Sequence, residues 1–167
     1  MVRMSPSIKR VFLVAGAVLL AAGVVTTVTQ RNLATGSDPW TPAELITPET
    51  LAKELSGSRK PTVICVAFKV LYDTGHVPGA LFFGPGRDPQ RVERLKQWAA
   101  SQPRSKPIVI YCGCCPWSHC PNVRPAFSLL KRMGFSRLQL VEIEYDFGRD
   151  WRDKGYPMEK SKTSPFY

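Results

Sequence analysis

Short apolar runs without polar alternation recur along the chain and alternate with amphipathic segments. Unbroken runs of this kind are typical of strands buried on both faces, as in parallel sheets. The predicted strands span residues 62–67, 80–83, 107–111 and 138–143, and the predicted helices begin at the capping sequence Thr47-Pro48-Glu49 and span 91–100 and 126–133. Because strands and helices alternate, the pattern predicts an α/β domain with a mostly parallel sheet flanked by helices.

A different apolar pattern occupies the N-terminus. Residues 11–28 form one uncharged, proline-free run, close to the roughly 20 residues of a membrane-spanning helix. Lys9 and Arg10 precede it, and positive charge at this position stays in the cytoplasm, so the remainder is expected on the extracytoplasmic, periplasmic side. No clear cleavage site follows, which favours a membrane anchor over a removed signal. If the segment is cleaved, we expect the domain to be secreted into the periplasm.

These patterns divide the chain into five parts. The total of 167 residues suits one domain with an appendage. We expect a basic cytoplasmic region at 1–10, a transmembrane anchor or signal at 11–28, a linker at 29–42, the domain at 43–160 and a C-terminal tail at 161–167.

The charge distribution narrows the choice of partners. The net charge is +10, and four basic residues with no acidic ones precede Gly36. The rest of the chain carries 19 basic and 13 acidic residues, a balance that suits a small anionic substrate. Basic stripes interleaved with aromatic residues, which nucleic-acid binding needs, are not seen in the sequence. We therefore expect no nucleic-acid partner, and we expect no cofactor.

Four of the five cysteines lie in one loop, at Cys112, Cys114, Cys115 and Cys120. The loop begins where a predicted strand ends and stops before a predicted helix, which is where open α/β sheets bind ligands. The free N–H groups and the positive dipole end at a helix start suit an anion and lower the pKa of a nearby thiol. The chemistry is expected here. The fifth cysteine, Cys65, lies within a predicted strand and is expected to be a small buried hydrophobe.

Three interpretations of this loop stay open. One cysteine acts as a nucleophile or carries a persulfide. Alternatively, soft ligands bind copper(I) or zinc, although the spacing is not a standard zinc pattern. In the third interpretation, a disulfide staples an exported loop. The ligands of the metal interpretation are Cys114, Cys115, His119 and Cys120.

Four sequence motifs occur in an order and at a spacing that resemble those of a known family. Residues 75–80 read G-H-V-P-G-A, and Tyr111-Cys112 follows directly on a Val/Ile strand. Residues 129–135 end a predicted helix with Gly-Phe, and residues 151–157 read W-x-x-x-G-Y-P. Together these motifs resemble the rhodanese (thiosulfate sulfurtransferase) family.

The resemblance covers roughly residues 46–159 and implies a single rhodanese-like domain. It implies that Cys112 takes sulfur from a small anionic donor such as thiosulfate, carries it as a persulfide and passes it to a thiol acceptor. Arg124 is the expected anion contact. The alternative is a catalytically silent rhodanese-like interaction domain with a disulfide-bridged loop. The alternative or resolving thiols are Cys114, Cys115 and Cys120.

The chain departs from the family pattern in two places. Its cysteine loop is longer and holds three further cysteines. Cys65 and Ala67 stand where the family's early strand has the Asp and Arg of a D-V-R motif. These differences leave the expected fold unchanged and concern the substrate and the chemistry.

Overall fold

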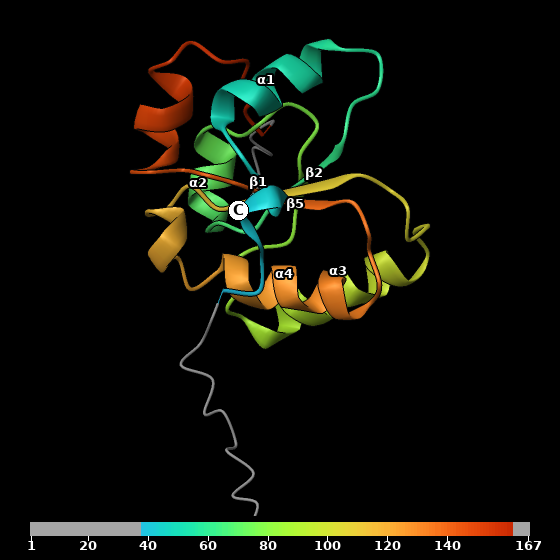
Figure 1. The fold of residues 1–167 in the computed structure, drawn as a ribbon. Helices are drawn as coiled ribbons and strands as arrows, with labels where there is room; N and C mark the ends of the chain where they lie inside the picture. The colour runs from blue at the N-terminus through green and yellow to red at the C-terminus, as the bar shows by residue number, and fades with distance from the viewer. Residues whose placement is uncertain (1–37, 162–167) are drawn as a thin grey trace, which may run out of the picture. The chain divides into compact units, whose positions relative to one another are not determined.

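The structure is a computed structural model that describes residues 38–161 (Figure 1). The elements follow the order η1 (Pro42–Glu44), β1 (Leu45–Ile46), α1 (Pro48–Ser56), β2 (Thr62–Cys65), α2 (Lys69–Thr74), β3 (Leu81–Phe82), α3 (Pro89–Ala100), β4 (Ile108–Tyr111), η2 (Trp117–His119), α4 (Val123–Arg132), β5 (Leu138–Val141) and η3 (Gly148–Arg152). The predicted anchor or signal at 11–28 and the basic region at 1–10 lie outside the described residues. Within 38–161, no helix combines the length and apolar character that crossing a membrane requires.

Five parallel strands form one sheet in the order β1-β5-β4-β2-β3. The predicted parallel sheet flanked by helices is therefore confirmed. Strands β2 and β4 are paired along their whole length, so Cys65 lies beside Tyr111, the last residue of β4. Because all strands run in one direction, their carboxyl ends share one edge of the sheet, and the cysteine loop starts at that edge.

Helices cover both faces of the sheet. Helices α3 and α4 pack together on one face, and α1 lies on the other (Figure 1). All four residues of β4 are buried, which explains why this strand reads as an unbroken apolar run. From α4, Phe127 and Leu130 are fully buried in the core. This packing fixes β4 and α4, the two elements that flank the cysteine loop.

The predicted elements occur with shifted bounds, and some elements were not predicted. At the start of α1, the Thr47 side chain accepts a hydrogen bond from the Thr50 amide at 3.2 Å, so the predicted cap is confirmed. Strand β1 and helix α2 have no counterpart among the predicted elements. β1 has two residues, too few for a periodic pattern, and α2 has six, none of them buried. The π-helix η3 was also not predicted.

Residues 38–42, the end of the predicted linker, pack against the domain. Trp40 is buried, with its ring centroid 5.5 Å from that of Phe127 and 5.8 Å from that of Trp117. Trp117 belongs to the cysteine loop and Phe127 to α4. The indole therefore joins the start of the described chain to both sides of the loop.

The C-terminal segment returns to the turn at residues 75–80. The backbones of His76 and Glu159 exchange two hydrogen bonds of 2.9 Å, forming an isolated antiparallel bridge. Trp151 is fully buried, and its indole N–H donates to the Pro157 carbonyl at 2.8 Å. The turn at 75–80 is thus paired with the end of the C-terminal segment, just after the motif at 151–157.

Candidate active site

The cysteine loop begins directly at the end of β4. Tyr111 is the last residue of the strand, and its phenol oxygen accepts a hydrogen bond from the Val77 amide at 3.1 Å. Cys112 follows, with 4% of its surface exposed. The strand thus delivers this thiol to the carboxyl edge of the sheet, as the sequence predicted. Cys65 on the neighbouring strand β2 is buried, which confirms its prediction as a small core residue.

The four loop cysteines form one group, called here the sulfur cluster. Cys114 Sγ lies 3.1 Å from Cys112 Sγ, 3.3 Å from Cys115 Sγ and 3.9 Å from Cys120 Sγ. Cys114 is thus the centre of the cluster. All five cysteines are free thiols in the structure. Gly113, between the first two cysteines, has a φ of +76°, a backbone conformation that glycine adopts without strain.

Asn122 lies beside the sulfur cluster and was not singled out from the sequence. It is fully buried, and its side-chain N–H group lies 3.5 Å from Cys112 Sγ and 3.6 Å from Cys114 Sγ. Its side-chain oxygen accepts a hydrogen bond from the Arg87 amide at 3.2 Å, which fixes the direction in which the amide points. An N–H donor between two sulfurs stabilises negative charge on either of them. Its position just before α4 was the available sequence signal.

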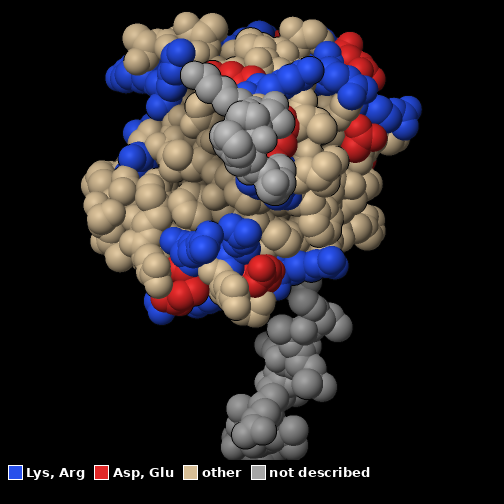
Figure 2. Space-filling model, turned by 180° about the vertical axis from the view of Figure 1, so that it is seen from behind, with Lys and Arg blue, Asp and Glu red and all other residues tan. Residues whose placement is uncertain are grey.

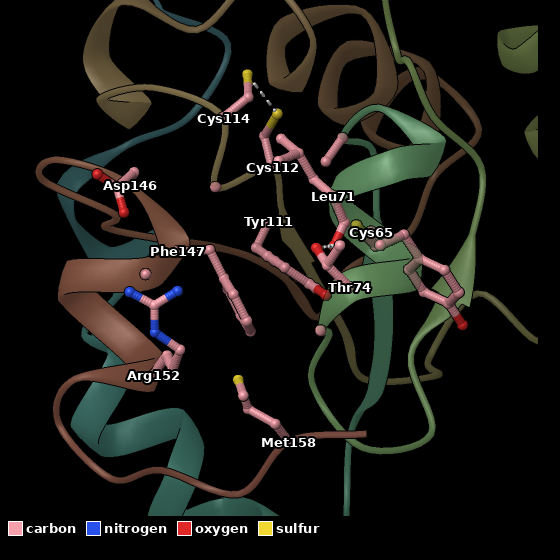
Figure 3. A pocket seen from close by; sticks show the side chains of 15 residues that line it. Cys65, Leu71, Thr74, Tyr111, Cys112, Cys114, Asp146, Phe147, Arg152 and Met158 are labelled. Atoms are coloured by element: carbon pink, nitrogen blue, oxygen red, sulfur yellow. Dashed lines mark hydrogen bonds between the residues drawn. The ribbon is translucent and has the colours of Figure 1, made fainter. Parts of the chain in front are cut away.

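A cavity of about 280 Å³ opens beside these sulfurs (Figure 3). Cys112 and Cys114 lie at one end of it, and Arg152 and Met158 come from the C-terminal segment. The cavity mixes apolar and polar groups, as small-molecule sites do. Its lining residues include Cys65, Leu71, Tyr72, Thr74, Tyr111, Asp146 and Phe147.

The sulfur cluster divides its charge unequally. Hydrogen bonds from Cys112 and Cys120, together with those from Cys115 and Asn122, hold the pKa of Cys114 far below the usual thiol value. The pKa of Cys112 is raised, because its thiol donates to Cys114 and because it is buried. The arrangement therefore favours negative charge on Cys114 over negative charge on Cys112. From the sequence, Cys112 was expected to be the nucleophile, and Cys114 was one of the three alternative or resolving thiols.

Arg124 lies at the outer side of the loop and does not line the cavity. Its guanidinium pairs with the Asp38 carboxylate at 2.5 Å and donates to the carbonyl oxygens of Ser118 and Cys120. It also lies over the Trp40 ring, 5.2 Å from the centroid. These contacts connect the loop to the start of the described chain. The expectation that Arg124 contacts an anion at Cys112 stays a prediction, and its observed partners are those of a loop-holding residue.

The structure does not bring His119 into the sulfur cluster. His119 is exposed, and its Nδ1 lies 3.0 Å from the Ser118 hydroxyl. Cys115 contacts Cys114, but the sulfurs that lie within 4.8 Å of one another are those of Cys112, Cys114 and Cys120. The metal-ligating group that the described residues offer is therefore different from the one predicted.

The cationic side chain at the cavity is Arg152, from η3. Its guanidinium also donates to the Asp153 carboxylate at 2.9 Å, and the side chain is largely exposed. On the face seen in Figure 2, Lys and Arg side chains form several groups with Asp and Glu among them. This distribution on that face is a mixed surface rather than a continuous basic stripe.

Comparison with known proteins adds to this geometry. Residues 47–143 match the family model described as the rhodanese-like domain. No curated protein sequence matches the chain.

Solved structures share the fold at low sequence identity. The crystal structure of the Alr3790 protein from Anabaena sp. is 21% identical, with a TM-score of 0.52, covering 69% of this chain and 82% of that one. The thiosulfate sulfurtransferase of Pseudomonas aeruginosa is 18% identical, with a TM-score of 0.51; the match covers 72% of this chain and 20% of that protein. The resemblance of the motifs, the fold and the family match agree: this chain belongs to the rhodanese-like domain family.

Proposed function

We propose that the chain is a sulfurtransferase that carries sulfur on Cys112 as a persulfide. The observation that carries this proposal is the 3.1 Å separation of Cys112 Sγ and Cys114 Sγ at the end of β4, where both cysteines line the cavity. Two adjacent cysteine sulfurs that line a cavity, with an N–H donor beside them, are suited to nucleophilic sulfur chemistry.

In the loading step, the proton shared by the two neighbouring sulfurs lies on Cys114, which leaves Cys112 as the thiolate in a minor form of the pair. The resulting Cys112 thiolate attacks the outer sulfur of thiosulfate, forming a sulfur–sulfur bond while the bond to the sulfonate sulfur breaks and sulfite leaves with its electron pair. The product is a Cys112 persulfide. The Asn122 side-chain N–H group, 3.5 Å from Cys112 Sγ, stabilises the thiolate that attacks.

In the transfer step, a thiolate acceptor attacks the outer sulfur of the persulfide. The acceptor leaves as a persulfide, and the Cys112 thiolate regains its proton. Splitting one sulfur transfer into two displacements in this way lowers each barrier. The cavity of about 280 Å³ admits a small donor and leaves Cys112 Sγ as the reacting atom at its end.

Arg152 is the residue we assign to the anionic donor. It lines the cavity with Cys112 and Cys114, whereas Arg124 is engaged by Asp38 and by loop carbonyls. A guanidinium suits an oxyanion such as the sulfonate end of thiosulfate, because it offers several N–H donors in one plane. Arg124 positions the cysteine loop through its hydrogen bonds to the Ser118 and Cys120 carbonyl oxygens.

The proposal includes a membrane tether on the extracytoplasmic side. The apolar run at 11–28 and the basic residues Lys9 and Arg10 before it support this assignment. If residues 11–28 anchor the chain, the full-length protein stays in the membrane pellet after alkaline carbonate washing. Protease added to intact spheroplasts should then digest the domain. Release into the wash, or protection from protease, contradicts the tether.

The activity is tested by following sulfite release from thiosulfate with a thiol acceptor present. We expect turnover by the full chain and none by Cys112→Ser. The matched control is Cys115→Ser, since the sulfur of Cys115 does not line the cavity. Equal rates for wild type and Cys112→Ser contradict the proposal.

A further inference from the structure

Three of the loop sulfurs lie close enough together to bind one metal ion. The Sγ atoms of Cys112, Cys114 and Cys120 all lie within 4.8 Å of one another. Cys112 and Cys120 are buried, and Cys114 is partly exposed at the cavity. Three soft donors thus converge from three positions of one loop, with one side open to the cavity.

We propose that this group is a copper(I) site, in which Cys112, Cys114 and Cys120 bind one ion as three thiolates. A metal–thiolate bond of about 2.3 Å places three sulfurs at trigonal corners about 4 Å apart. The 3.9 Å between Cys114 Sγ and Cys120 Sγ meets this spacing directly. The 3.1 Å between Cys112 Sγ and Cys114 Sγ has to open by roughly 1 Å, which a rotation of the partly exposed Cys114 side chain provides.

The donor set selects the metal. Thiolates are soft ligands, and soft ligands favour copper(I). Structural zinc almost always has four ligands. In residues 38–161 the sulfurs that all lie within 4.8 Å of one another number three, and Cys115, which contacts Cys114, is not among them. His119, the nitrogen donor closest in sequence, is exposed and lies against Ser118. The group therefore suits copper(I) better than zinc.

Asn122 donates hydrogen bonds to two of the proposed ligands. Its side-chain N–H group reaches Cys112 Sγ and Cys114 Sγ, and its oxygen is held by the Arg87 amide. Hydrogen bonds of this kind orient ligands and offset the negative charge of a thiolate complex. On binding, copper(I) replaces the thiol protons, which pass to solvent, and no electron is transferred.

The site shares Cys112 with the proposed sulfur chemistry, yet it stands without that proposal. Copper(I) bound by three sulfurs requires only reduced thiols in this geometry. The experiment therefore contains no sulfur donor, and its outcome is separate from the fate of the sulfurtransferase assignment.

The test is a titration of the reduced full-length chain with copper(I) under anaerobic conditions, against bathocuproine disulfonate as the competing chelator. We expect one copper(I) per chain withdrawn from the chelator. Cys114→Ser and Cys120→Ser should each weaken the affinity by more than about 100-fold, since loss of a group that only supports a ligand already costs about 10- to 100-fold.

The control is His119→Ala, which leaves all four loop sulfurs in place and should bind as the wild type does. X-ray absorption of the loaded wild type should show a sulfur-only shell with three neighbours. Circular dichroism of each variant establishes that it is folded. Equal binding by wild type and Cys120→Ser, loss of binding in His119→Ala, or no withdrawal of copper by the wild type overturns the proposal.

Discussion

Gly113 lies directly against Phe147, and the Phe147 amide donates a hydrogen bond to the Gly113 carbonyl at 3.0 Å. A Cβ atom placed on Gly113 would come within 2.7 Å of the Phe147 Cβ. Phe147 in turn stacks on Tyr111 and on Trp151, with ring centroids 5.6 Å and 5.9 Å away. The turn that separates Cys112 from Cys114 is therefore locked by the aromatic core of the C-terminal segment.

Gly113→Ala should lower the free energy of unfolding by more than the strain of a positive φ accounts for. We expect a loss in unfolding free energy of about 2–4 kcal/mol, because the new Cβ meets Phe147 and the backbone is strained. Gly134→Ala is the matched control: its φ is +85° and a Cβ there meets nothing within 4 Å, so only the strain of about 1 kcal/mol applies. Urea denaturation measures both. Equal losses would show that contact with Phe147 is unimportant.

Asn122→Ala should impair both stability and sulfur loading. The Arg87 amide loses its acceptor, which costs about 1–3 kcal/mol, and the two sulfurs lose their N–H donor. We expect the rate of sulfite release at saturating thiosulfate to fall by about 10-fold or more, in line with loss of a donor to a developing charge. Stopped-flow measurement of the loading step tests this. A variant that is destabilised but loads at the wild-type rate contradicts the role of the amide.

Arg152→Gln should act on the binding of the donor. Arg152 lines the cavity, so removing its charge should raise KM for thiosulfate by about 3- to 10-fold while kcat changes little, as expected for a partly exposed ionic contact. Arg149→Gln is the control, because the Arg149 guanidinium lies over the Tyr145 ring, 4.2 Å from its centroid, and is not part of the cavity lining. Equal KM values for Arg152→Gln and Arg149→Gln would contradict the role of Arg152 in binding thiosulfate.

Cys65 should make stability depend on alkaline pH. Burial raises the pKa of its thiol from 9.0 to about 11 in the folded chain. Between these values the unfolded chain loses the proton and the folded chain keeps it, so stability is full below about pH 9 and falls as pH rises toward 11.

Comparison with Cys65→Ala isolates this effect, because other thiols titrate in both proteins. The stability difference between wild type and Cys65→Ala should move by about 2–3 kcal/mol against the wild type over that range. Denaturation at several pH values measures it. A difference that stays constant from pH 9 to pH 11 contradicts the assigned pKa.

The fold and the position of the cysteine loop were predictable from local pattern. The unbroken apolar run ending at Tyr111 marked a buried strand, and the cysteines that follow it necessarily lie at the carboxyl edge of the sheet. The partners of these cysteines were not predictable. Asn122 is ten residues beyond Cys112, and its orientation depends on the Arg87 amide in a loop far away in sequence. Arg152 lines the cavity, and the C-terminal segment that carries it returns to the turn at His76, which no periodic pattern indicates.

Arg124 was singled out from the sequence, but its observed contacts lie away from the cavity. Its position after the cysteines suggested an anion contact, but the Asp38 carboxylate and the Trp40 ring compete for the same guanidinium. Both lie more than eighty residues earlier in the chain and within a stretch that reads as a linker. A sequence pattern indicates which residue types are near the site, whereas long-range packing decides which of them face it.

The central claim is that Cys112 carries sulfur, and intact-mass spectrometry of the reduced full-length chain tests it most directly. After incubation with thiosulfate, the wild type and Cys115→Ser should gain the mass of one sulfur atom, and a thiol acceptor should remove it. Cys112→Ser should gain nothing. A wild type whose mass does not change, or a Cys112→Ser chain that still gains the sulfur atom, would contradict the account.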